Sequence, residues 1–347
     1  MIRLATIAGA RPQFVKVAVV ARALARLEGV EHILIHTGQH FDHNMSAKVF
    51  DELAIPAPDH NLGIAGGPHG QMTGRMMEAI EAIFLDARPD AVLVYGDTNS
   101  TLAGALVAAK LHIPVHHIEA GLRSFNRRMP EEVNRVLADH VSALLFCPTP
   151  TAVEHLRAEG ITEGVHLVGD VMYDATLFAK EAARQRSTIT SDLGLEEGAY
   201  AVLTLHRAET TDDPARLLDV CRYVTEQAAG REVIFPVHPR TRQAFQRFGI
   251  EPSGMRMIEP VGYVDMHRLL AGAALVMTDS GGLQKEAYFH HVPCLTLRDE
   301  TEWVETIEAG WNRLWTSPDY LPRREIDAFG DGRAGQKIAR IIEAAHR

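Results

Sequence analysis

The chain is predicted to be an α/β protein built from two Rossmann-like domains, and three observations indicate this fold class. Short apolar runs alternate with longer amphipathic runs, which is typical of strands that alternate with helices. The short runs are apolar along nearly their whole length, as expected of parallel strands buried on both faces. The alternation occurs in two successive series, and 347 residues are enough for two domains.

The elements follow in order along the chain. The predicted strands of the first series are Arg3–Ala8, His32–His36, Ala91–Tyr95, Val115–Ile118, Ala143–Cys147 and Val165–Val168. Those of the second series are Ala201–Leu205, Val233–Val237, Met257–Glu259, Leu275–Thr278 and Cys294–Leu297. The predicted helices between them include Phe14–Leu27, Gly70–Asp86, Thr101–Leu111, Pro214–Ala228 and Gly281–Phe289.

These elements predict where the domains begin and end. Residues 1–170 form the predicted N-terminal domain and residues 171–330 the C-terminal one, with the break near Gly169–Ser191. The last segment, residues 331–347, contains a predicted helix. Because ligands of open parallel sheets bind outside the carboxyl ends of the strands, the loops after the strands should carry the functional residues.

Composition limits the possible partners. The net charge is −10, from 35 basic and 45 acidic residues, which disfavours a general nucleic-acid or anionic-membrane surface. No apolar run approaches the ~20 residues of a membrane helix, and the N-terminus lacks the pattern of a signal peptide. The three cysteines show no disulfide or metal-binding spacing, so they are expected to fill the core of a cytoplasmic protein.

The first strand leads into the segment GARPQFVK, residues 9–16. Arg11 and Lys16 then lie beside the start of a helix, where a positive helix end makes basic residues unfavourable by ~0.3–1 kcal/mol unless an anion is bound. The alternative is a solvated basic turn. We expect a phosphate site here, although the GxGxxG fingerprint of a dinucleotide site is absent.

A second strand–glycine–helix junction is TDSGGLQKEA, residues 278–287. Ser280, Gly281 and Gly282 offer backbone N–H groups to a diphosphate, and Glu286 can accept from both hydroxyls of a ribose. The structural alternative is a helix cap made by Asp279 or by Ser280.

The strongest indication of catalytic chemistry comes from three carboxylates. Asp97 and Glu119 each follow a predicted strand, and Glu131 opens a helix with Arg135 one turn later. Asp97 and Glu131 could each serve only as a helix cap or a favourable charge at a helix dipole. Three carboxylates at one sheet edge nevertheless repel unless they share a cation or a proton, an arrangement that suits proton transfer.

Histidines at strand ends indicate an anionic ligand. His206 is followed by Arg207, and His238 by Arg240 after one proline, each pair at the end of a predicted strand. Two other groups of histidines lack metal-binding motifs, so no metal is expected. These groups are His36, His40 and His43, and His112, His116 and His117.

These motifs, in this order, closely resemble the non-hydrolysing UDP-N-acetylglucosamine 2-epimerase family. The resemblance spans nearly the whole chain. It rests on GARPQFVK, TGQH, YGDTNSTLAGALVAAK, HIEAGLRS, PEEVNR, VGDVMYDA, HRAET, VHPR, DSGGLQKEA and RDETEW. It implies a GT-B-like fold with the ligand in the interdomain cleft, UDP held mainly by the C-terminal domain, a homodimer, and a last helix that packs back on the N-terminal domain.

The resemblance also implies roles for individual residues. The expected catalytic residues are Asp97, Glu119, Glu131 and His206. The expected substrate-binding residues are Arg11, Lys16, Arg135, His238, Tyr263, Ser280, Gly281, Gly282 and Glu286. No cofactor is expected.

The chemistry can be argued separately from the resemblance. The proton on C2 of such a sugar is not next to a carbonyl, so direct abstraction is difficult. Oxidation at C3 by a nicotinamide would need a fingerprint that the chain lacks. Elimination of UDP instead makes C2 acidic, and a carboxylate can then remove the proton to give a 2-acetamidoglucal before UDP adds back.

Departures from the motifs that are usual in this family leave the identity of the sugar substrate open. Ala208, Thr210 and Trp303 stand where Arg, Asn and Arg are usual in epimerases of UDP-N-acetylglucosamine (UDP-GlcNAc). Epimerases of UDP-2,3-diacetamido-2,3-dideoxy-glucuronate, which serve O-antigen or capsule synthesis, look more like this chain. HFDHNMS, residues 40–46, also differs from the stretch linked to activation by substrate.

The leading hypothesis is a UDP-GlcNAc 2-epimerase that forms UDP-N-acetylmannosamine (UDP-ManNAc) for polysaccharide biosynthesis. The uronate epimerase is the first alternative, and a hydrolysing epimerase that releases UDP is the second. A GT-B glycosyltransferase and a non-catalytic nucleotide-sugar sensor are alternatives of other classes.

Overall fold

The computed structural model describes residues 1–39 and 50–346. The chain divides into two units, each with its own parallel sheet. Unit 1 comprises Met1–Ala175 and Asp327–Arg347, and unit 2 comprises Thr176–Ile326. His40, His43 and the segment HFDHNMS lie outside the described residues.

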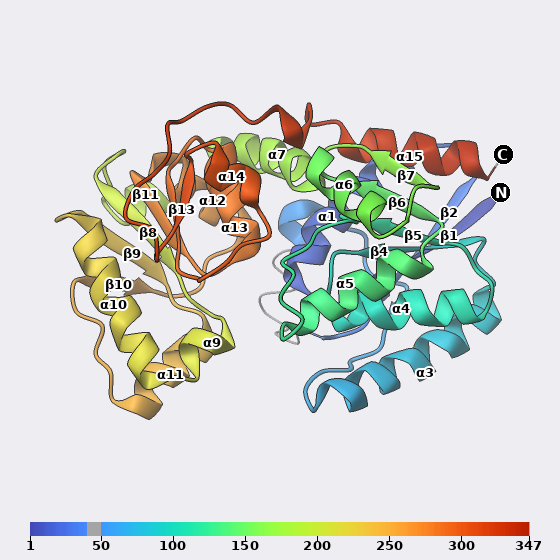
Figure 1. The fold of residues 1–347 in the computed structure, drawn as a ribbon, viewed down its shortest axis with the longest axis horizontal. Helices are drawn as coiled ribbons and strands as arrows, with labels where there is room; N and C mark the ends of the chain where they lie inside the picture. Colours follow the sequence, from blue (N-terminus) through green and yellow to red (C-terminus); the bar gives the residue numbers. More distant parts are fainter. Residues whose placement is uncertain (40–49, 347) are drawn as a thin grey trace. The chain divides into compact units, whose positions relative to one another are not determined.

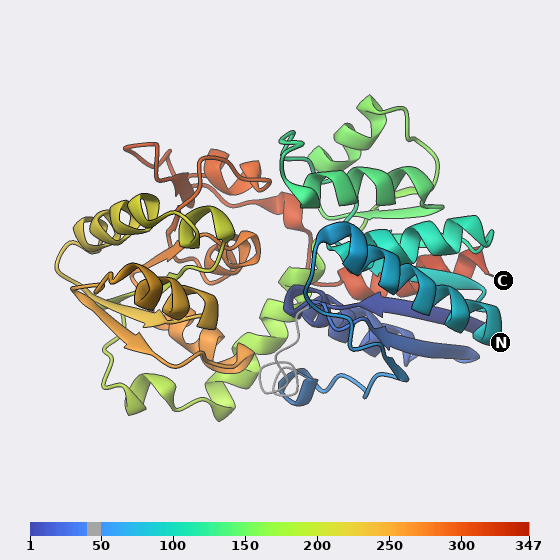
Figure 2. The same ribbon diagram turned by 90° about the horizontal axis from the view of Figure 1, so that it is seen from below.

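The sheet of unit 1 has the strand order β3-β2-β1-β4-β5-β6-β7, and every pairing in it is parallel. β1 and β2 run side by side (Figures 1 and 2). The strands are β1 (Ile2–Ala8), β2 (Val30–His36), β3 (His60–Asn61), β4 (Ala91–Tyr95), β5 (Val115–Ile118), β6 (Leu144–Cys147) and β7 (Val165–Leu167). The helices are α1 (Arg11–Leu24), α3 (His69–Ala87), α4 (Asn99–Lys110), α5 (Pro130–Val141), α6 (Pro150–Ala158) and α15 (Ala334–Ala345).

Helices cover both faces of this sheet. In Figure 1, α3 and α4 lie on one side of the sheet and α15 on the other. β4 is buried along its whole length, which agrees with its unbroken apolar sequence AVLVY. Gly104 of α4 lies directly on Ile7 of β1, because a Cβ at residue 104 would be 2.9 Å from Ile7 Cγ1.

The sheet of unit 2 has the strand order β10-β9-β8-β11-β12-β13, again entirely parallel. This is the doubly wound order of a Rossmann fold. The strands are β8 (Tyr200–Thr204), β9 (Glu232–Pro236), β10 (Met255–Ile258), β11 (Leu275–Thr278), β12 (Cys294–Thr296) and β13 (Asn312–Leu314). The helices are α8 (Ile189–Asp192), α9 (Ala208–Thr211), α10 (Pro214–Ala228), α11 (Pro239–Phe248), α12 (Tyr263–Gly272), α13 (Gly281–Phe289) and α14 (Val304–Glu308).

The chain passes from unit 1 to unit 2 within α7 (Val171–Arg186) and returns to unit 1 at Asp327. The carboxylate of Asp174 on α7 accepts from the backbone N–H groups of Ala334 and Gly335 at 3.1 and 3.0 Å, and thus caps α15. Gly335 also approaches Val19 of α1 closely enough that a Cβ there would lie 2.6 Å from Val19 Cγ1. The C-terminal helix is therefore part of unit 1.

Most predicted elements are present, with shifted ends. α1 begins three residues before the predicted Phe14, because Gln13 accepts from the backbone N–H groups of Gly9 and Ala10 at 2.8 and 3.0 Å. Sequence analysis missed β3 and β13, since a two-residue strand and the polar run Asn312–Leu314 carry little apolar signal. Within residues 1–39 and 50–346, no helix is long and apolar enough to span a membrane.

Candidate functional site

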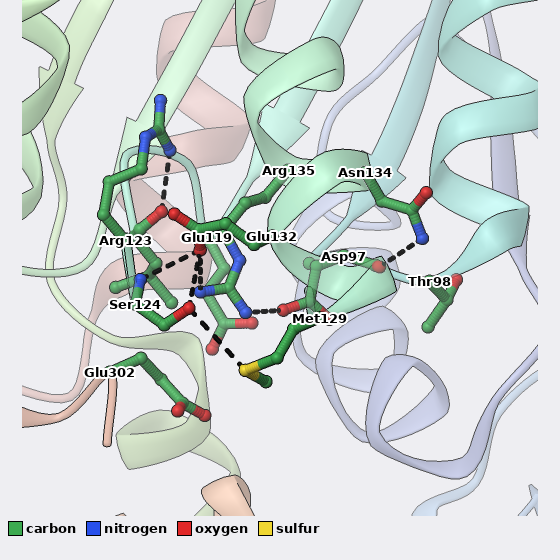
Figure 3. Close-up of polar contacts among 12 residues, drawn as sticks. Asp97, Thr98, Glu119, Arg123, Ser124, Met129, Glu132, Asn134, Arg135 and Glu302 are labelled. Atoms are coloured by element: carbon green, nitrogen blue, oxygen red, sulfur yellow. Dashed lines mark hydrogen bonds and ion pairs between the residues drawn. The ribbon is translucent and has the colours of Figure 1, made fainter. Parts of the chain in front are cut away.

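Asp97 lies in the turn after β4 and forms an ion pair with Arg135 of α5 (Figure 3). It does not cap α4, because Thr98 does so by accepting from the backbone N–H of Thr101. The backbone carbonyl of Asp97 accepts from Asn134 Nδ2 at 2.9 Å, which ties this turn to α5. The helix-cap alternative for Asp97 is therefore wrong, and its carboxylate remains about one third exposed beside a cation.

Glu119 follows β5 with a φ of +70°, a left-handed conformation that is uncommon for a residue with a side chain. Its carboxylate forms an ion pair with Lys16 of α1, and both side chains are only 8% exposed. The pair lies against Gly96, the residue before Asp97. A Cβ on Gly96 would be 3.2 Å from Glu119 Oε2 and 3.2 Å from Lys16 Nζ. The ends of β4 and β5 thus each carry a carboxylate that is paired with a cation, Asp97 with Arg135 and Glu119 with Lys16.

The neighbouring residues Glu131 and Glu132 in the first turn of α5 differ sharply. Glu131 is half-buried and has no ion-pair or hydrogen-bond partner among the described residues. Glu132 is buried, and its carboxylate accepts from the backbone N–H groups of Ser124 and Phe125, both at 2.9 Å. It also accepts from Arg135 Nη1 at 3.2 Å (Figure 3). Glu132, which sequence analysis missed, orders the loop before α5 and leaves Glu131 available for chemistry.

The start of α1 does not present all its predicted groups to an anion. Gln13 occupies the backbone N–H groups of Gly9 and Ala10, and its own amide donates to Tyr95 O at 2.8 Å. Lys16 points to Glu119. Arg11 is partly exposed and forms no ion pair within the described chain, so it is the group there that can reach a phosphate.

In unit 2, His206 follows β8 and meets Asp279, which follows the neighbouring β11. Asp279 Oδ2 accepts from the backbone N–H groups of His206 and Arg207, both at 2.8 Å, and Oδ1 lies 3.0 Å from His206 Nδ1. Although burial raises the pKa of Asp279, His206 and the two backbone N–H groups outweigh it, so the net pKa is lowered and the group is ionised. A carboxylate on Nδ1 leaves Nε2 of His206 to face a ligand.

The start of α13 has no internal cap. Ser280 occupies the N-cap position without a side-chain hydrogen bond, and the first turn contains no acidic residue. The cap expected as the structural alternative, from Asp279 or Ser280, is therefore absent. Gly282 has open space around it, since a Cβ there would meet no atom within 4 Å. At Gly281, by contrast, a Cβ would lie 2.3 Å from Glu302 Oε1, so the open backbone of this helix start is at Gly282. An uncapped helix start with open backbone can bind an anion.

Three further predicted residues lie in other parts of unit 2. Glu286 of α13 is 6% exposed, and its Oε1 lies 3.6 Å from His267 Nε2. Tyr263, the first residue of α12, is buried with its ring 4.3 Å from that of His267. His238 is exposed and caps α11 by accepting from the backbone N–H of Arg240 at 3.2 Å, which gives it a structural role. Its ring centroid is 5.8 Å from that of His206.

Other titratable groups of the described residues bear on the metal and cysteine predictions. In the part of the chain that the structure covers, no group of three or more His, Cys, Asp or Glu side chains could hold a metal ion. Burial lowers the pKa of His116 to about 3, so this ring is neutral at pH 7. The three cysteines are free and buried, as predicted, and burial raises the pKa of Cys147 to about 12.

Comparisons with known proteins agree with this fold. A sequence model described as UDP-N-acetylglucosamine 2-epimerase matches residues 22–343. The UDP-2,3-diacetamido-2,3-dideoxy-D-glucuronate 2-epimerase of Pseudomonas aeruginosa is 52% identical, over 98% of this chain and 99% of that protein. The UDP-N-acetylglucosamine 2-epimerase of Methanocaldococcus jannaschii is 42% identical, over 98% of each. A crystal structure of the M. jannaschii enzyme in complex with UDP-GlcNAc and UDP has a TM-score of 0.91 and 40% identity, covering 99% of this chain and 100% of that one.

Two doubly wound parallel sheets with acids and histidines at their strand ends define an α/β enzyme of the nucleotide-binding type. The chain belongs to the UDP-N-acetylglucosamine 2-epimerase family. The predicted fold class of two Rossmann-like domains, GT-B-like, is confirmed, as is the predicted enzyme class of isomerase.

Proposed function

We propose that the protein is a non-hydrolysing 2-epimerase that interconverts UDP-GlcNAc and UDP-ManNAc. The observation that carries the proposal is the pair of cation-held carboxylates, Asp97–Arg135 and Glu119–Lys16, on adjacent strand ends of a chain in this family. A carboxylate next to a fixed cation stays ionised and can accept a proton from carbon.

The reaction proceeds by elimination and re-addition. The bond between C1 and the β-phosphate oxygen breaks, and UDP leaves with the electron pair. A carboxylate of unit 1 removes the proton from C2, and the C–H electrons form the C1–C2 double bond of 2-acetamidoglucal. Re-addition of UDP at C1, with a proton delivered to the opposite face of C2, gives the epimer. Asp97, Glu119 and Glu131 supply the groups for the two faces.

Unit 2 holds the departing UDP in this proposal. The uncapped start of α13 at Ser280, Gly281 and Gly282 stabilises the charge that develops on the diphosphate. Glu286 accepts from the ribose hydroxyls, and His206, oriented by Asp279, donates to the leaving oxygen. Arg11, His238 and Tyr263 complete the proposed substrate contacts.

A second substrate is favoured by specific observations. The P. aeruginosa relative, named as a UDP-2,3-diacetamido-glucuronate epimerase, is more similar in sequence than the M. jannaschii relative. Trp303 is 3% exposed and covers Lys285, whose Nζ lies 3.5 Å from the centre of the indole ring. Epimerases of UDP-GlcNAc usually have an arginine at the position of Trp303. An arginine here could not make this buried contact with Lys285 without desolvating a second cation.

Incubation with each UDP-sugar in deuterated water tests these proposals. Deuterium at C2 together with UDP-ManNAc formed from UDP-GlcNAc supports the first substrate. If only the UDP-diacetamido uronate is turned over, that sugar is the substrate in place of UDP-GlcNAc. A new glycosidic bond would instead support the transferase alternative, and free UDP with released sugar the hydrolysing one. Asp97→Asn should abolish exchange, whereas Asp86→Asn on the exposed surface of α3 should not.

Homodimerisation, cytoplasmic location and a role in polysaccharide biosynthesis remain predictions. Sedimentation of the purified protein decides the first of them, because a dimer of this 38.2 kDa chain has twice the monomer mass.

A further inference from the structure

A buried polar network lies behind the two acid-bearing turns of unit 1. The side chains of His117 on β5 and Asp139 on α5 are both fully buried. His117 Nδ1 lies 2.7 Å from Asp139 Oδ1, and Nε2 lies 2.8 Å from the backbone oxygen of Gly96. Nothing in the proposed reaction uses either residue.

The two partners of His117 determine its protonation. A backbone oxygen can only accept, so Nε2 must carry a proton. Asp139 also accepts, because its other oxygen, Oδ2, accepts from Arg123 Nη1 at 2.7 Å and from the backbone N–H of Gly121 at 3.1 Å, as an ionised carboxylate does. Nδ1 must therefore carry a proton as well, and the ring is an imidazolium.

The surrounding charges are compatible with a cationic ring. Arg123 donates to Asp139 Oδ2 at 2.7 Å and forms a two-pronged pair with Glu159 at 2.7 and 2.8 Å. Buried Asp139 then lies between two cations, Arg123 and His117, while the partly exposed Glu159 pairs with the other side of Arg123. Cys147, the nearby thiol of β6, stays neutral, since burial raises its pKa to about 12. His140 lies 3.7 Å from Glu159 at the exposed edge of the network.

The network forms hydrogen bonds with the backbone next to each of the two proposed acids. Gly96, held by His117 Nε2, immediately precedes Asp97 and has a φ of +60°. Gly121, whose N–H donates to Asp139 Oδ2 at 3.1 Å, is two residues after Glu119. Both turns contain left-handed residues, which persist only where the surroundings hold them.

We propose that His117 is a positioning residue, a doubly protonated ring that together with Asp139 clamps the turns carrying Asp97 and Glu119. The role in catalysis rests on the proposed function, whereas the charge state of the ring does not. His117 acts through the backbone and touches neither acid.

Two variants separate the two hydrogen bonds. In His117→Gln the amide takes the place of Nε2 and keeps a donor to Gly96 O, whereas in His117→Asn it takes the place of Nδ1 and keeps only the donor to Asp139. We expect kcat of His117→Asn to fall by about 100-fold, because small displacements of catalytic groups are costly, with the KM and the Kd for UDP unchanged. His117→Gln should retain at least ~10 times more activity than His117→Asn. Equal kcat in the two variants, or a loss confined to UDP binding, would overturn the positioning role.

Nitrogen-15 NMR of the wild-type full-length protein tests the charge state without any reaction. The side chain of His117, assigned through its own Hβ correlations, should show a directly bonded hydrogen on both ring nitrogens at pH 7. A single N–H would overturn the imidazolium even if both variants failed to fold. If the wild type turned over no UDP-sugar while both hydrogens were present, the proposed function would fail and the charge assignment would stand.

Discussion

Glu131 and Glu132 are adjacent and chemically identical, yet their surroundings give them opposite roles. Glu132 is buried and accepts hydrogen bonds from Ser124, Phe125 and Arg135, so it contributes to stability. Glu131, with no partner in the described part of the chain, contributes little to the fold and is free to act as an acid or base.

Matched substitutions test this division. Glu131→Gln should lower kcat by ~10²–10⁴, as for loss of a general acid or base, and leave the free energy of unfolding within ~0.5 kcal/mol of wild type. Glu132→Gln should reduce the free energy of unfolding by ~1–3 kcal/mol, because it removes a buried charge that pairs with Arg135. Urea unfolding and steady-state kinetics on both variants measure these effects, and the reverse pattern would contradict the assignment.

Gly282 offers a test of the phosphate site at a single residue. A Cβ at this position meets no protein atom within 4 Å, so Gly282→Ala should leave thermal stability nearly unchanged. If a diphosphate approaches the backbone here, the added methyl group should weaken UDP binding by about tenfold, or ~1.4 kcal/mol. Calorimetric titration of Gly282→Ala with UDP measures the change. An affinity equal to that of the wild type would show that the diphosphate does not approach the backbone at Gly282.

Among the elements, α3 and α4 cover the same face of the first sheet but differ in how closely they approach their neighbours. The α4 residue Gly104 lies on β1, where a Cβ would be 2.9 Å from Ile7 Cγ1. The α3 residue Gly74 is exposed, with nothing within 4 Å of a Cβ. The close approach of α4 keeps its N-terminus, and hence Asp97, fixed against the sheet.

Alanine at these two glycines should have opposite effects. Gly104→Ala should destabilise the protein by ~1–3 kcal/mol through overpacking against Ile7. Gly74→Ala should stabilise it by ~0.5–1 kcal/mol, because alanine has the higher helix propensity. Denaturant midpoints decide the question, and destabilisation by both variants would show that α3 also packs closely at residue 74.

At the scale of the whole molecule, a buried aspartate in each unit has its pKa held below the ordinary value of 3.8. Asp139 serves this role in unit 1 and Asp279 in unit 2. Because the folded-state pKa is the lower one, the contribution to stability is complete above pH 3.8 and is lost as the pH falls through the folded value.

We therefore expect both units to lose stability on acidification. The urea midpoint of the wild type should drop steeply below about pH 4. Asp279→Asn keeps an acceptor for His206 and Arg207 but removes the charge, so it should be less stable at neutral pH and show a shallower acid dependence. Unfolding followed from about pH 7 to pH 3 measures both slopes, and parallel curves would contradict the linkage.

Much of this architecture could be predicted from local signals. The strand Ala91–Tyr95 and the helices Pro214–Ala228 and Gly281–Phe289 have the predicted bounds. An unbroken apolar run marks the strand, the Asp213 cap and Pro214 mark the start of the first helix, and the two glycines mark the start of the second. The grouping of Lys16 with Glu119 could not be predicted in this way. Those residues are 103 positions apart, and the local hydrophobic pattern carries no information about a contact over that separation.

The sequence alone determined the two-series α/β fold, the family, and the residue types at the strand ends, since these depend on hydrophobic period and on motifs within a few residues. The tertiary structure decided which glutamate is buried, that Asp279 holds His206 and does not cap α13, and that His117 faces two acceptors. These depend on distances between segments far apart in the chain, and such distances are set only when the sheets are assembled and desolvated groups must find partners.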